Sequence, residues 1–363
     1  MMQREKKGRV FVGVSGGVDS SLSLALLKSQ GYEVVGVFIR TWQPDWLECS
    51  WREEKKDAMR VCAQLDIPFV ELNLEKEYEQ GVVHYMLDEY RQGRTPNPDV
   101  MCNRAIKFGA FFRWAREQGA DFVATGHYAR IRKQGNHFSL LRGVDRNKDQ
   151  SYFLWTLKKK QLPHILFPVG EFEKSDVRKK AKEFGIVTAP KPDSQGICFL
   201  GDVDMKDFLR HYIDEREGDV VDEKGNIIGT HSGVMFFTLG ERHGFTIHKK
   251  ATGGGPYYVI GKDGEKNILM VSQEPEKGEE KGEDYLLSQV NNLEGIFSPG
   301  REFDVQIRYR GSLKRVSILS YNKDKGEMHI RFHTPDYTIA LGQSIVFYDG
   351  DICLGGGIIE RKL

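Results

Sequence analysis

The segment RVFVGVSGGVDSS, residues 9–21, places a short apolar run directly before a loop of small and polar residues. The run ends at Val14, and the loop contains Gly16, Gly17 and Asp19 ahead of a helical pattern that continues to Ser29. Glycines let backbone amides face a ligand without a Cβ in the way, and the N-terminus of a helix favours an anion. The segment therefore predicts a strand, a phosphate-binding loop and a helix.

Short apolar runs and helical patterns alternate through the first half of the chain. The expected strands cover 33–39, 69–72 and 121–125, and the expected helices cover 57–65, 104–118 and 174–184. Short strands separated by helices predict βαβ units and a buried, doubly wound parallel sheet. We assign this α/β domain to residues 1–205.

The pattern changes after about residue 214, where short β-type runs and turn signals follow one another. Lys224-Gly225-Asn226 and Lys262-Asp263-Gly264 are hairpin signals, and the charged stretch 277–283 is typical of a linker. Further short apolar runs between 303 and 354 predict a small antiparallel barrel. We expect a small, mostly β domain at 206–280 and a C-terminal β-barrel at 281–363.

The composition is that of a soluble globular protein, with 39% hydrophobic and 29% charged residues in 363. A formal net charge of +1 neither indicates nor excludes a nucleic-acid partner. No run approaches the roughly 18 apolar residues of a membrane helix, and the first residues have no signal-peptide cleavage site. We expect a cytoplasmic protein with no membrane partner.

Five cysteines, without a Cys-x-x-Cys pair, argue against a disulfide framework and a structural zinc site. Cys49, Cys62 and Cys353 fit small buried hydrophobes. Cys102 follows Thr95-Pro-Asn-Pro-Asp-Val-Met and precedes a helix expected to begin near Arg104. A thiol just before a helix N-terminus is expected to have a lowered pKa.

Asp99, three residues before Cys102, is a candidate proton donor or acceptor. Cys198 stands in Asp193-Ser-Gln-Gly-Ile-Cys198-Phe, where the polar and glycine residues favour exposure and the flanking apolar residues do not. For either cysteine taken alone, burial as a small hydrophobe explains the pattern equally well.

In the phosphate loop, Ser15 and Ser20 can donate hydroxyl hydrogen bonds, and Asp19 can hold Mg²⁺ against phosphate oxygens. A tight turn would explain the small residues but not the two serines and the aspartate. The loop lacks the Gly-Lys-Ser/Thr of a Walker A loop. It resembles the pyrophosphate loop of ATP-pyrophosphatases, which cleave ATP between the α and β phosphates and transfer AMP to a substrate oxygen.

Taken with the two cysteine loops, the chain resembles the bacterial tRNA-specific 2-thiouridylases over nearly its whole length. The matching segments are 13–21, 93–108, 124–128, 148–155, 193–199 and 350–360. The resemblance implies an ATP-pyrophosphatase domain of the adenine nucleotide alpha hydrolase-like kind, followed by a small mixed β domain and a C-terminal β-barrel.

The resemblance also implies a reaction on the wobble uridine, position 34, in the anticodon loop of tRNA. ATP would adenylate the C2 oxygen, and a persulfide on Cys198 would supply the sulfur. Cys102 would attack that persulfide, leaving a Cys102–Cys198 disulfide, AMP and pyrophosphate. A cysteine desulfurase or a sulfur-relay protein would load the persulfide, and the base would leave its stack to react.

By the same resemblance, individual positions take roles. The ATP site would include Gly13, Val14, Ser15, Gly16, Gly17, Val18, Asp19, Ser20, Ile39 and Gly126. The target base would be contacted by Asn97, Pro98 and Asp99. The tRNA would be contacted by His127, Lys148, Asp149, Gln150, Arg308, Tyr309 and Gln343.

Plainer interpretations stand beside several of these roles. His127 alone fits a hydrogen-bonded core or surface histidine. Arg308, Tyr309 and Arg310 are expected to alternate on a strand, so that one face at most would serve RNA. The chain departs from the family pattern in two places. The segment 239–244 is less basic than the corresponding segment of the family, and Ile39 stands where the family has a methionine.

Two other functions compete with thiolation. An AMP-forming ligase of the argininosuccinate synthase kind would need ATP but no thiols. A non-catalytic tRNA-binding protein would bind RNA with steep salt dependence and form no AMP. An iron–sulfur cluster on Asp99, Cys102 and Cys198 is a further hypothesis, but these are fewer thiolates than such clusters usually use, so we do not expect one.

Overall fold

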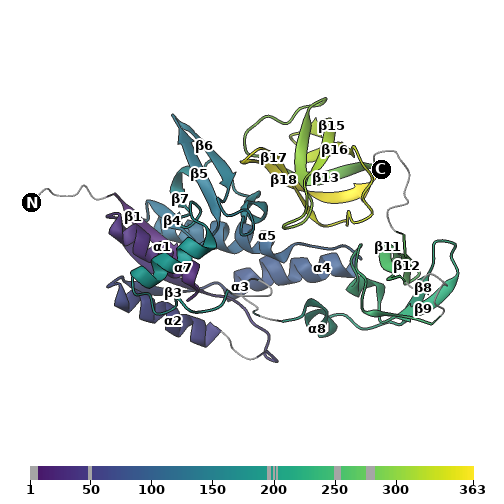
Figure 1. Ribbon diagram of the computed structural model, residues 1–363, viewed down its shortest axis with the longest axis horizontal. Coiled ribbons are helices and arrows are strands. Elements are labelled where there is room, and N and C mark those ends of the chain that lie inside the picture. Colours follow the sequence, from purple (N-terminus) through teal and green to yellow (C-terminus); the bar gives the residue numbers. More distant parts are fainter. Residues whose placement is uncertain are drawn as a thin grey trace, which may run out of the picture.

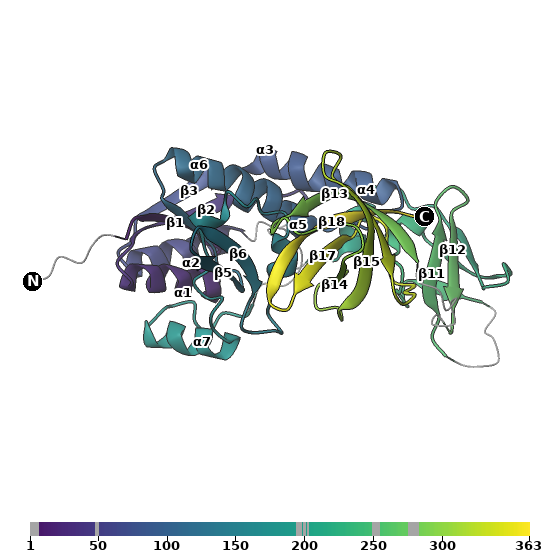
Figure 2. The same ribbon diagram turned by 90° about the horizontal axis from the view of Figure 1, so that it is seen from above.

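The computed structural model describes residues 7–47, 51–193, 198, 201, 203–248, 255–274 and 283–363. Cys49 and the predicted linker 277–283, except its last residue, lie outside these ranges. An N-terminal α/β part and a central β part occupy opposite ends of the molecule (Figure 1). A long helical run connects these ends, and the C-terminal barrel lies beside this run (Figure 2).

Parallel strands form the N-terminal sheet in the order β3-β2-β1-β4-β7. Their bounds are β1 Arg9–Gly13, β2 Glu33–Arg40, β3 Phe69–Asn73, β4 Phe122–Ala124 and β7 Ile165–Leu166. Helices α1 (Val18–Ser29), α2 (Trp51–Gln64) and α7 (Lys174–Glu183) contribute to one hydrophobic cluster together with Val10 and Val12. Phe11, between those valines, belongs to the cluster on the other face. Both faces are covered, so the predicted doubly wound α/β fold is confirmed.

Two helical runs cover the second face of this sheet. They are α3 Glu75–Tyr78, η1 Glu79–His84 and α4 Tyr85–Arg91, and then α5 Pro98–Cys102, η2 Asn103–Phe111 and α6 Phe112–Glu117. The second run begins six residues before the predicted helix at 104 because Asn97 caps it. The Asn97 Oδ1 accepts a hydrogen bond from the Val100 N–H at 3.1 Å, and Pro98 sits at the first helical position. Cys102 therefore lies within a helix.

A mostly antiparallel sheet forms the central part, in the order β10-β9-β8-β12-β11. Its strands are β8 Gly218–Val221, β9 Ile227–His231, β10 Phe245–Ile247, β11 Tyr258–Asp263 and β12 Ile268–Ser272. Helix α8 (Met205–Arg210) and the short segment η5 (Val234–Phe236) accompany it. Both predicted hairpins, β8–β9 and β11–β12, are confirmed.

The C-terminal strands close into a barrel because β13 pairs with both β16 and β18. Its strands are β13 Asp284–Asn292, β14 Glu302–Gln306, β15 Lys314–Asn322, β16 Glu327–Phe332, β17 Ser344–Asp349 and β18 Ile352–Lys362. Since β14 ends at Gln306, Arg308 and Tyr309 lie in the loop after it, and the prediction of a strand there is wrong.

A hairpin from the first half of the chain extends the barrel sheet. Strands β5 (Ala129–Gln134) and β6 (His137–Arg142) join it through the β6–β18 pairing of Leu140 with Cys353. The short segments η3 (Ser151–Leu154) and η4 (Leu162–His164) follow this hairpin. The domain boundaries 1–205, 206–280 and 281–363 remain our proposal. The barrel sheet includes strands from two of these domains, because β5 and β6 belong to the first and the other strands to the last.

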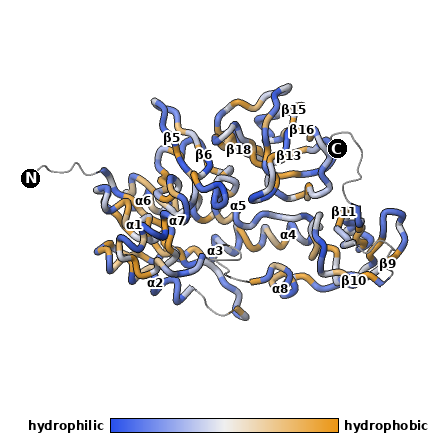
Figure 3. Tube along the Cα trace, viewed as in Figure 1, coloured by the Kyte–Doolittle hydropathy of each residue, from blue (hydrophilic) through white to orange (hydrophobic). Residues whose placement is uncertain are grey.

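The hydropathy of the chain alternates along its helices and strands rather than forming long apolar stretches (Figure 3). Among the helices in the described ranges, none combines the length and the apolar character needed to cross a membrane.

The contact between the barrel and the α/β part tolerates no extra volume at Gly356. A Cβ there would lie 2.5 Å from the Ile345 carbonyl oxygen and 2.9 Å from the Trp155 ring. We predict that Gly356→Ala lowers the free energy of unfolding by about 1–3 kcal/mol, as overpacking does, measured by urea denaturation. Gly264→Ala is the matched control, because its Cβ would meet nothing within 4 Å. An unchanged midpoint for Gly356→Ala would contradict this packing.

Candidate functional site

The phosphate loop lies between the end of β1 and the start of α1. The Ser20 Oγ accepts a hydrogen bond from the Ser15 N–H at 3.2 Å and donates to the Gly17 carbonyl at 3.2 Å. Gly17 is the N-cap of α1, and no side-chain hydrogen bond caps the helix there. The loop therefore presents a helix N-terminus without a side-chain cap, an arrangement that favours an anion.

Two glycines of the site are required by close backbone approach. Gly16 has a φ of +72°, and a Cβ on it would lie 2.5 Å from the Glu54 carbonyl oxygen. A Cβ on Gly126 would lie 2.7 Å from the Ser20 backbone nitrogen. Gly126 thus brings the end of β4 directly against the phosphate loop, where any side chain would displace it.

A cluster of alternating charges fills the region beside the loop. Lys174 Nζ contacts both carboxylate oxygens of Asp19 at 2.7 and 2.8 Å, and it reaches Asp193 at 2.9 Å. Lys148 Nζ also contacts Asp193, at 2.7 Å. Burial opposes ionisation of Asp193, but the hydrogen bonds from the two lysines outweigh it and lower its pKa to about 2. The Asp193 carboxylate is therefore an anion bound by three cations, since the Arg178 guanidinium also contacts it, at 2.6 Å.

The two candidate cysteines lie in contact. The Cys102 thiol donates to the Cys198 Sγ, with the sulfurs 3.4 Å apart and no disulfide between them. The Cys198 backbone is fixed on both sides: its N–H donates to Asp99 Oδ1 at 3.1 Å, and its carbonyl accepts from the Tyr78 hydroxyl at 2.7 Å. A separation near 3.5 Å is that of reacting atoms before bond formation.

The pKa shifts of the two thiols have opposite directions. Burial raises the pKa of the Cys102 thiol well above its usual value, so the sequence-based expectation of a lowered pKa is wrong. The hydrogen bond from Cys102 lowers the pKa of Cys198, assisted by the charge of Lys107. Of the two thiols, Cys198 is therefore the one that loses its proton more readily.

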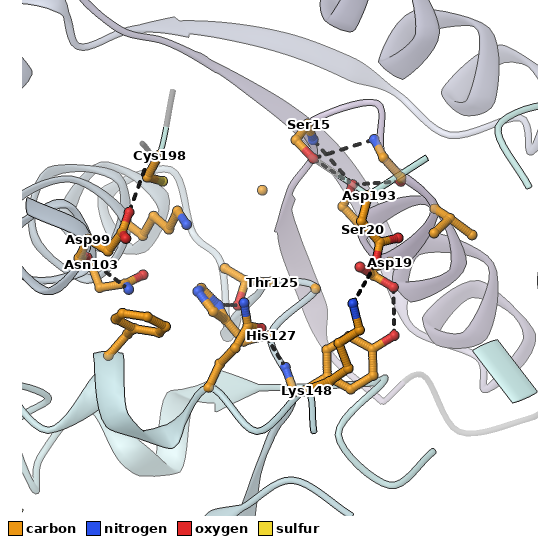
Figure 4. A pocket seen from close by; sticks show the side chains of 18 of the residues that line it. Ser15, Asp19, Ser20, Asp99, Asn103, Thr125, His127, Lys148, Asp193 and Cys198 are labelled. Carbon is orange, nitrogen blue, oxygen red and sulfur yellow. Dashed lines mark hydrogen bonds and ion pairs between the residues drawn. The ribbon is translucent and has the colours of Figure 1, made fainter. Parts of the chain in front are cut away.

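One cavity of about 580 Å³ connects the phosphate loop with Cys198. In Figure 4, Cys198, Asp99 and Asn103 lie on one side, and Ser15, Ser20 and Asp19 lie on the other. Thr125 and His127 lie between them. A nucleotide bound at the loop and the sulfur of Cys198 would thus share one cavity.

The predicted site residues divide into those that line this cavity and those that do not. The lining residues are Gly13, Val14, Ser15, Gly17, Val18, Asp19, Ser20, Ile39, Asp99, Gly126, His127, Lys148, Gln150, Cys198 and Tyr309. The predicted residues outside the lining are Gly16, Asn97, Pro98, Cys102, Asp149, Arg308 and Gln343. Cys102 nevertheless contacts the lining through Cys198.

Several residues with an expected tRNA contact make internal contacts. Asp149 is buried and accepts hydrogen bonds from the Gly143 and Ser151 N–H groups. Arg308 donates to the Leu239 and Thr338 carbonyls and so joins the central part to the barrel. His127 is buried, with its Nδ1 2.7 Å from the Thr125 hydroxyl.

The rim of the cavity is aromatic and basic. The ring of Tyr309 lies 4.5 Å from that of Phe153, and the Arg310 guanidinium lies 5.0 Å from the Tyr309 ring. Arg310 has a φ of +60°, a conformation that non-glycine residues rarely adopt. Neighbouring aromatic and guanidinium groups are typical of surfaces that bind an unstacked base.

Sequence reasoning missed four cavity residues with chemistry of their own: Asn103, Lys107, Tyr128 and Lys174. Asn103 donates to the Asp99 carbonyl, while its buried Oδ1 has no hydrogen-bond partner among the described residues. The Tyr128 hydroxyl donates to Asp19 at 2.7 Å. Asn103 directly follows Cys102 and Lys107 lies five residues after it, and this closeness to Cys102 was the available signal for both.

An iron–sulfur cluster or another metal site needs several donor side chains that converge. The described residues contain no group of three or more His, Cys, Asp or Glu side chains that could hold an ion, so Asp99, Cys102 and Cys198 do not fit a cluster. Asp19 offers one carboxylate, which suits Mg²⁺ that arrives with substrate phosphates. In this structure, Lys174 forms an ion pair with that carboxylate.

Three family models match the chain in order. They are described as a tRNA methyl transferase HUP domain at residues 8–202, a tRNA methyl transferase PRC-barrel domain at 206–273 and an aminomethyltransferase beta-barrel domain at 288–359. The tRNA-specific 2-thiouridylase MnmA of Listeria monocytogenes is 44% identical over 97% of this chain and 94% of its own. That of Staphylococcus aureus is 46% identical over 97% of this chain and 95% of its own.

Solved structures give weaker similarity. The U34-tRNA thiolase NcsA from Methanococcus maripaludis is 16% identical, with a TM-score of 0.34 over 51% of this chain and 60% of that one. A 4-thiouridine synthetase in complex with RNA and ATP is 18% identical, with a TM-score of 0.35 over 56% and 50%. These scores are too low to carry an argument. The end-to-end identity with the curated relatives does carry one: this chain belongs to the family of tRNA-specific 2-thiouridylases.

Proposed function

We propose that this protein replaces the C2 oxygen of the wobble uridine of tRNA with sulfur, in the cytoplasm, using ATP and a persulfide on Cys198. The observation that carries the proposal is the 3.4 Å contact between Cys102 and Cys198, with Cys198 in the same cavity as the phosphate loop. Neither a ligase nor a passive RNA-binding protein has a use for two free cysteines in contact beside a phosphate site.

The phosphate loop would bind the ATP phosphates through the N-terminus of α1, with Ser15 and Ser20 as hydroxyl donors. The uridine O2 would attack the α-phosphorus, and pyrophosphate would leave. Lys174 and Lys148 stand where they can neutralise phosphate charge, since both already bind the Asp193 anion. Mg²⁺ bound with the nucleotide at Asp19 would supply further neutralisation of the phosphates.

The sulfur would arrive by attack of the Cys198 thiolate on a persulfide of a donor protein, such as a cysteine desulfurase or a relay protein. The donor leaves as a thiolate, and Cys198 keeps the outer sulfur. That sulfur then attacks C2, and AMP leaves with the former O2.

Cys102 would then attack Cys198 Sγ, which breaks the bond to the transferred sulfur and leaves it on the base. The products are 2-thiouridine and a Cys102–Cys198 disulfide, which a cellular dithiol must reduce before another turnover. Cys102 has to lose its proton in this step. Asp99 is the candidate acceptor, because burial raises the pKa of its carboxyl.

The tRNA would place the flipped uridine between the two halves of the cavity, with Tyr309 and Arg310 against the anticodon loop. The buried Asn103 Oδ1 is an acceptor suited to the N3–H of a uracil ring.

The proposal predicts that the two half-reactions separate in single-turnover experiments. With ATP, Mg²⁺, a cysteine desulfurase and unmodified tRNA, Cys198→Ser is expected to release AMP but form no thiouridine, because the sulfur carrier is missing. Cys353→Ala, a buried cysteine in β18, is the control that keeps both products. Thiouridine formed by Cys198→Ser would refute the carrier, and AMP without thiouridine in the wild type would point to another acceptor.

A second prediction concerns the nucleotide half of the cavity. Gly126→Ala places a Cβ against the Ser20 backbone and is expected to move the loop by on the order of 1 Å, enough for about a 100-fold loss of AMP formation. Persulfide loading of Cys198, followed by mass spectrometry, should be unaffected. Gly264→Ala serves as the control. Normal AMP formation by Gly126→Ala would place the nucleotide elsewhere.

A further inference from the structure

Lys107 is brought next to the sulfur pair by an unusual helix. It lies five residues after Cys102 in η2, which is π-helical. A π-helix bonds residue i to residue i+5, so residues five apart lie nearly above one another. In an α-helix, with 3.6 residues per turn, the fifth residue would face a different direction.

The sequence supports this π-helical winding at Gly109. A Cβ on Gly109 would lie 2.6 Å from the carbonyl oxygen of Arg104, five residues earlier. Only glycine allows that approach without displacement of the backbone. The winding that aligns Lys107 with Cys102 is therefore built into the chain, and π-helical segments occur frequently at functional sites.

Lys107 is the cation that acts on both sulfurs. It lines the cavity with Asp99 and Cys198, and its positive charge favours the anionic form of Cys198. Burial disfavours the charged ammonium, but the two sulfurs outweigh this effect and raise the pKa of Lys107. His127 cannot replace this cation, because burial, together with the charge of Lys107, lowers the pKa of its imidazole.

We propose that Lys107 is a catalytic residue of the sulfur-transfer half-reaction, whose ammonium keeps Cys198, and then the persulfide on it, anionic and reactive. This inference rests on the proposed function and adds a residue to it.

The ammonium would act at two steps without losing its proton. When Cys198 attacks the donor persulfide, the electron pair of its thiolate forms the new S–S bond, and the donor sulfur leaves with the pair of the old one. When Cys102 later attacks Cys198 Sγ, the pair of that S–S bond passes to the sulfur on C2. Lys107 is the nearby positive charge that holds the anion before each transfer.

The test measures how the alkylation of Cys198 depends on pH, because the thiolate is the form that reacts. Cys198 is alkylated with iodoacetamide between pH 5 and 10, and its peptide is quantified by mass spectrometry. The charged and titratable groups that face it are Tyr78, Asp99, Cys102 and Lys107. Lys107→Met is expected to move the alkylation midpoint up by about one pH unit or more, so that alkylation at pH 7 slows about tenfold.

Three further variants control for loss of structure and for loss of charge in general. Lys107→Arg keeps a cation and should restore the wild-type midpoint, whereas Lys107→Gln provides a second neutral side chain if Lys107→Met is unstable. Arg104→Met removes a charge from the same helix, where Arg104 is exposed and contacts Gln289 of the barrel, and should titrate like the wild type.

The outcome is independent of whether this chain thiolates tRNA, because alkylation needs neither ATP nor RNA. A wild-type midpoint for both neutral variants would overturn the role of Lys107 even if thiolation proceeds. In turnover, Lys107→Met should lower kcat for thiouridine while the KM for ATP and the rate of AMP formation stay unchanged. An equal loss of AMP formation would mean that Lys107 serves the nucleotide half or the fold instead.

Discussion

Two backbone hydrogen bonds place Cys198, and the chemistry of the cavity depends on them. Its N–H is held by Asp99 and its carbonyl by Tyr78, so a residue 96 positions away from Cys102 is fixed with its sulfur 3.4 Å from the Cys102 thiol. Both anchors come from the helical runs that cover the second face of the parallel sheet. The packing of that face therefore sets the geometry of the sulfur pair.

The cavity has two half-sites, one at the phosphate loop and one at the cysteine pair, and each has its own charged groups. Around the phosphate loop, Lys174 and Lys148 are neutralised by Asp19 and Asp193. Around the sulfurs, Lys107 favours the anionic form of Cys198. A nucleotide must compete with two carboxylates for its cations, whereas Lys107 already acts on the cysteine pair and on Asp99 before any substrate arrives. Asp193 also lies in the sequence segment that leads to Cys198, so the two half-sites are neighbours along the chain as well as in the cavity.

The sequence predicted features that depend on local pattern and missed those that depend on burial or winding. The parallel sheet could be predicted because its strands are apolar on both faces. The phosphate loop could be predicted because glycines, serines and an aspartate between a strand and a helix are typical of phosphate binding. The π-helical form of 103–111 could not be predicted, since the same residue types also form α-helices. The pKa of Cys102 was mispredicted because its helix begins at Pro98 and the thiol is completely buried. The β5–β6 hairpin carried a readable signal in Gly135-Asn136, but its pairing with β18 is a long-range contact.

That long-range pairing explains how the barrel contributes to a cavity formed mostly by the α/β part. Strand β6 pairs with β18, and Trp155 packs against Gly356, so the barrel is held against the residues that follow the hairpin. Tyr309 then meets Phe153 at the rim, and Arg308 secures the same loop to the central part through Leu239. A base at this rim would contact a loop supported by both β parts. Further contacts hold the same two parts together, because Arg94 Nη1 lies 2.9 Å from Glu360 Oε1 of β18 and the Thr95 N–H donates to the Leu341 carbonyl at 2.7 Å. The loop at the rim is therefore held in place relative to the phosphate loop by contacts on both sides of the barrel seam.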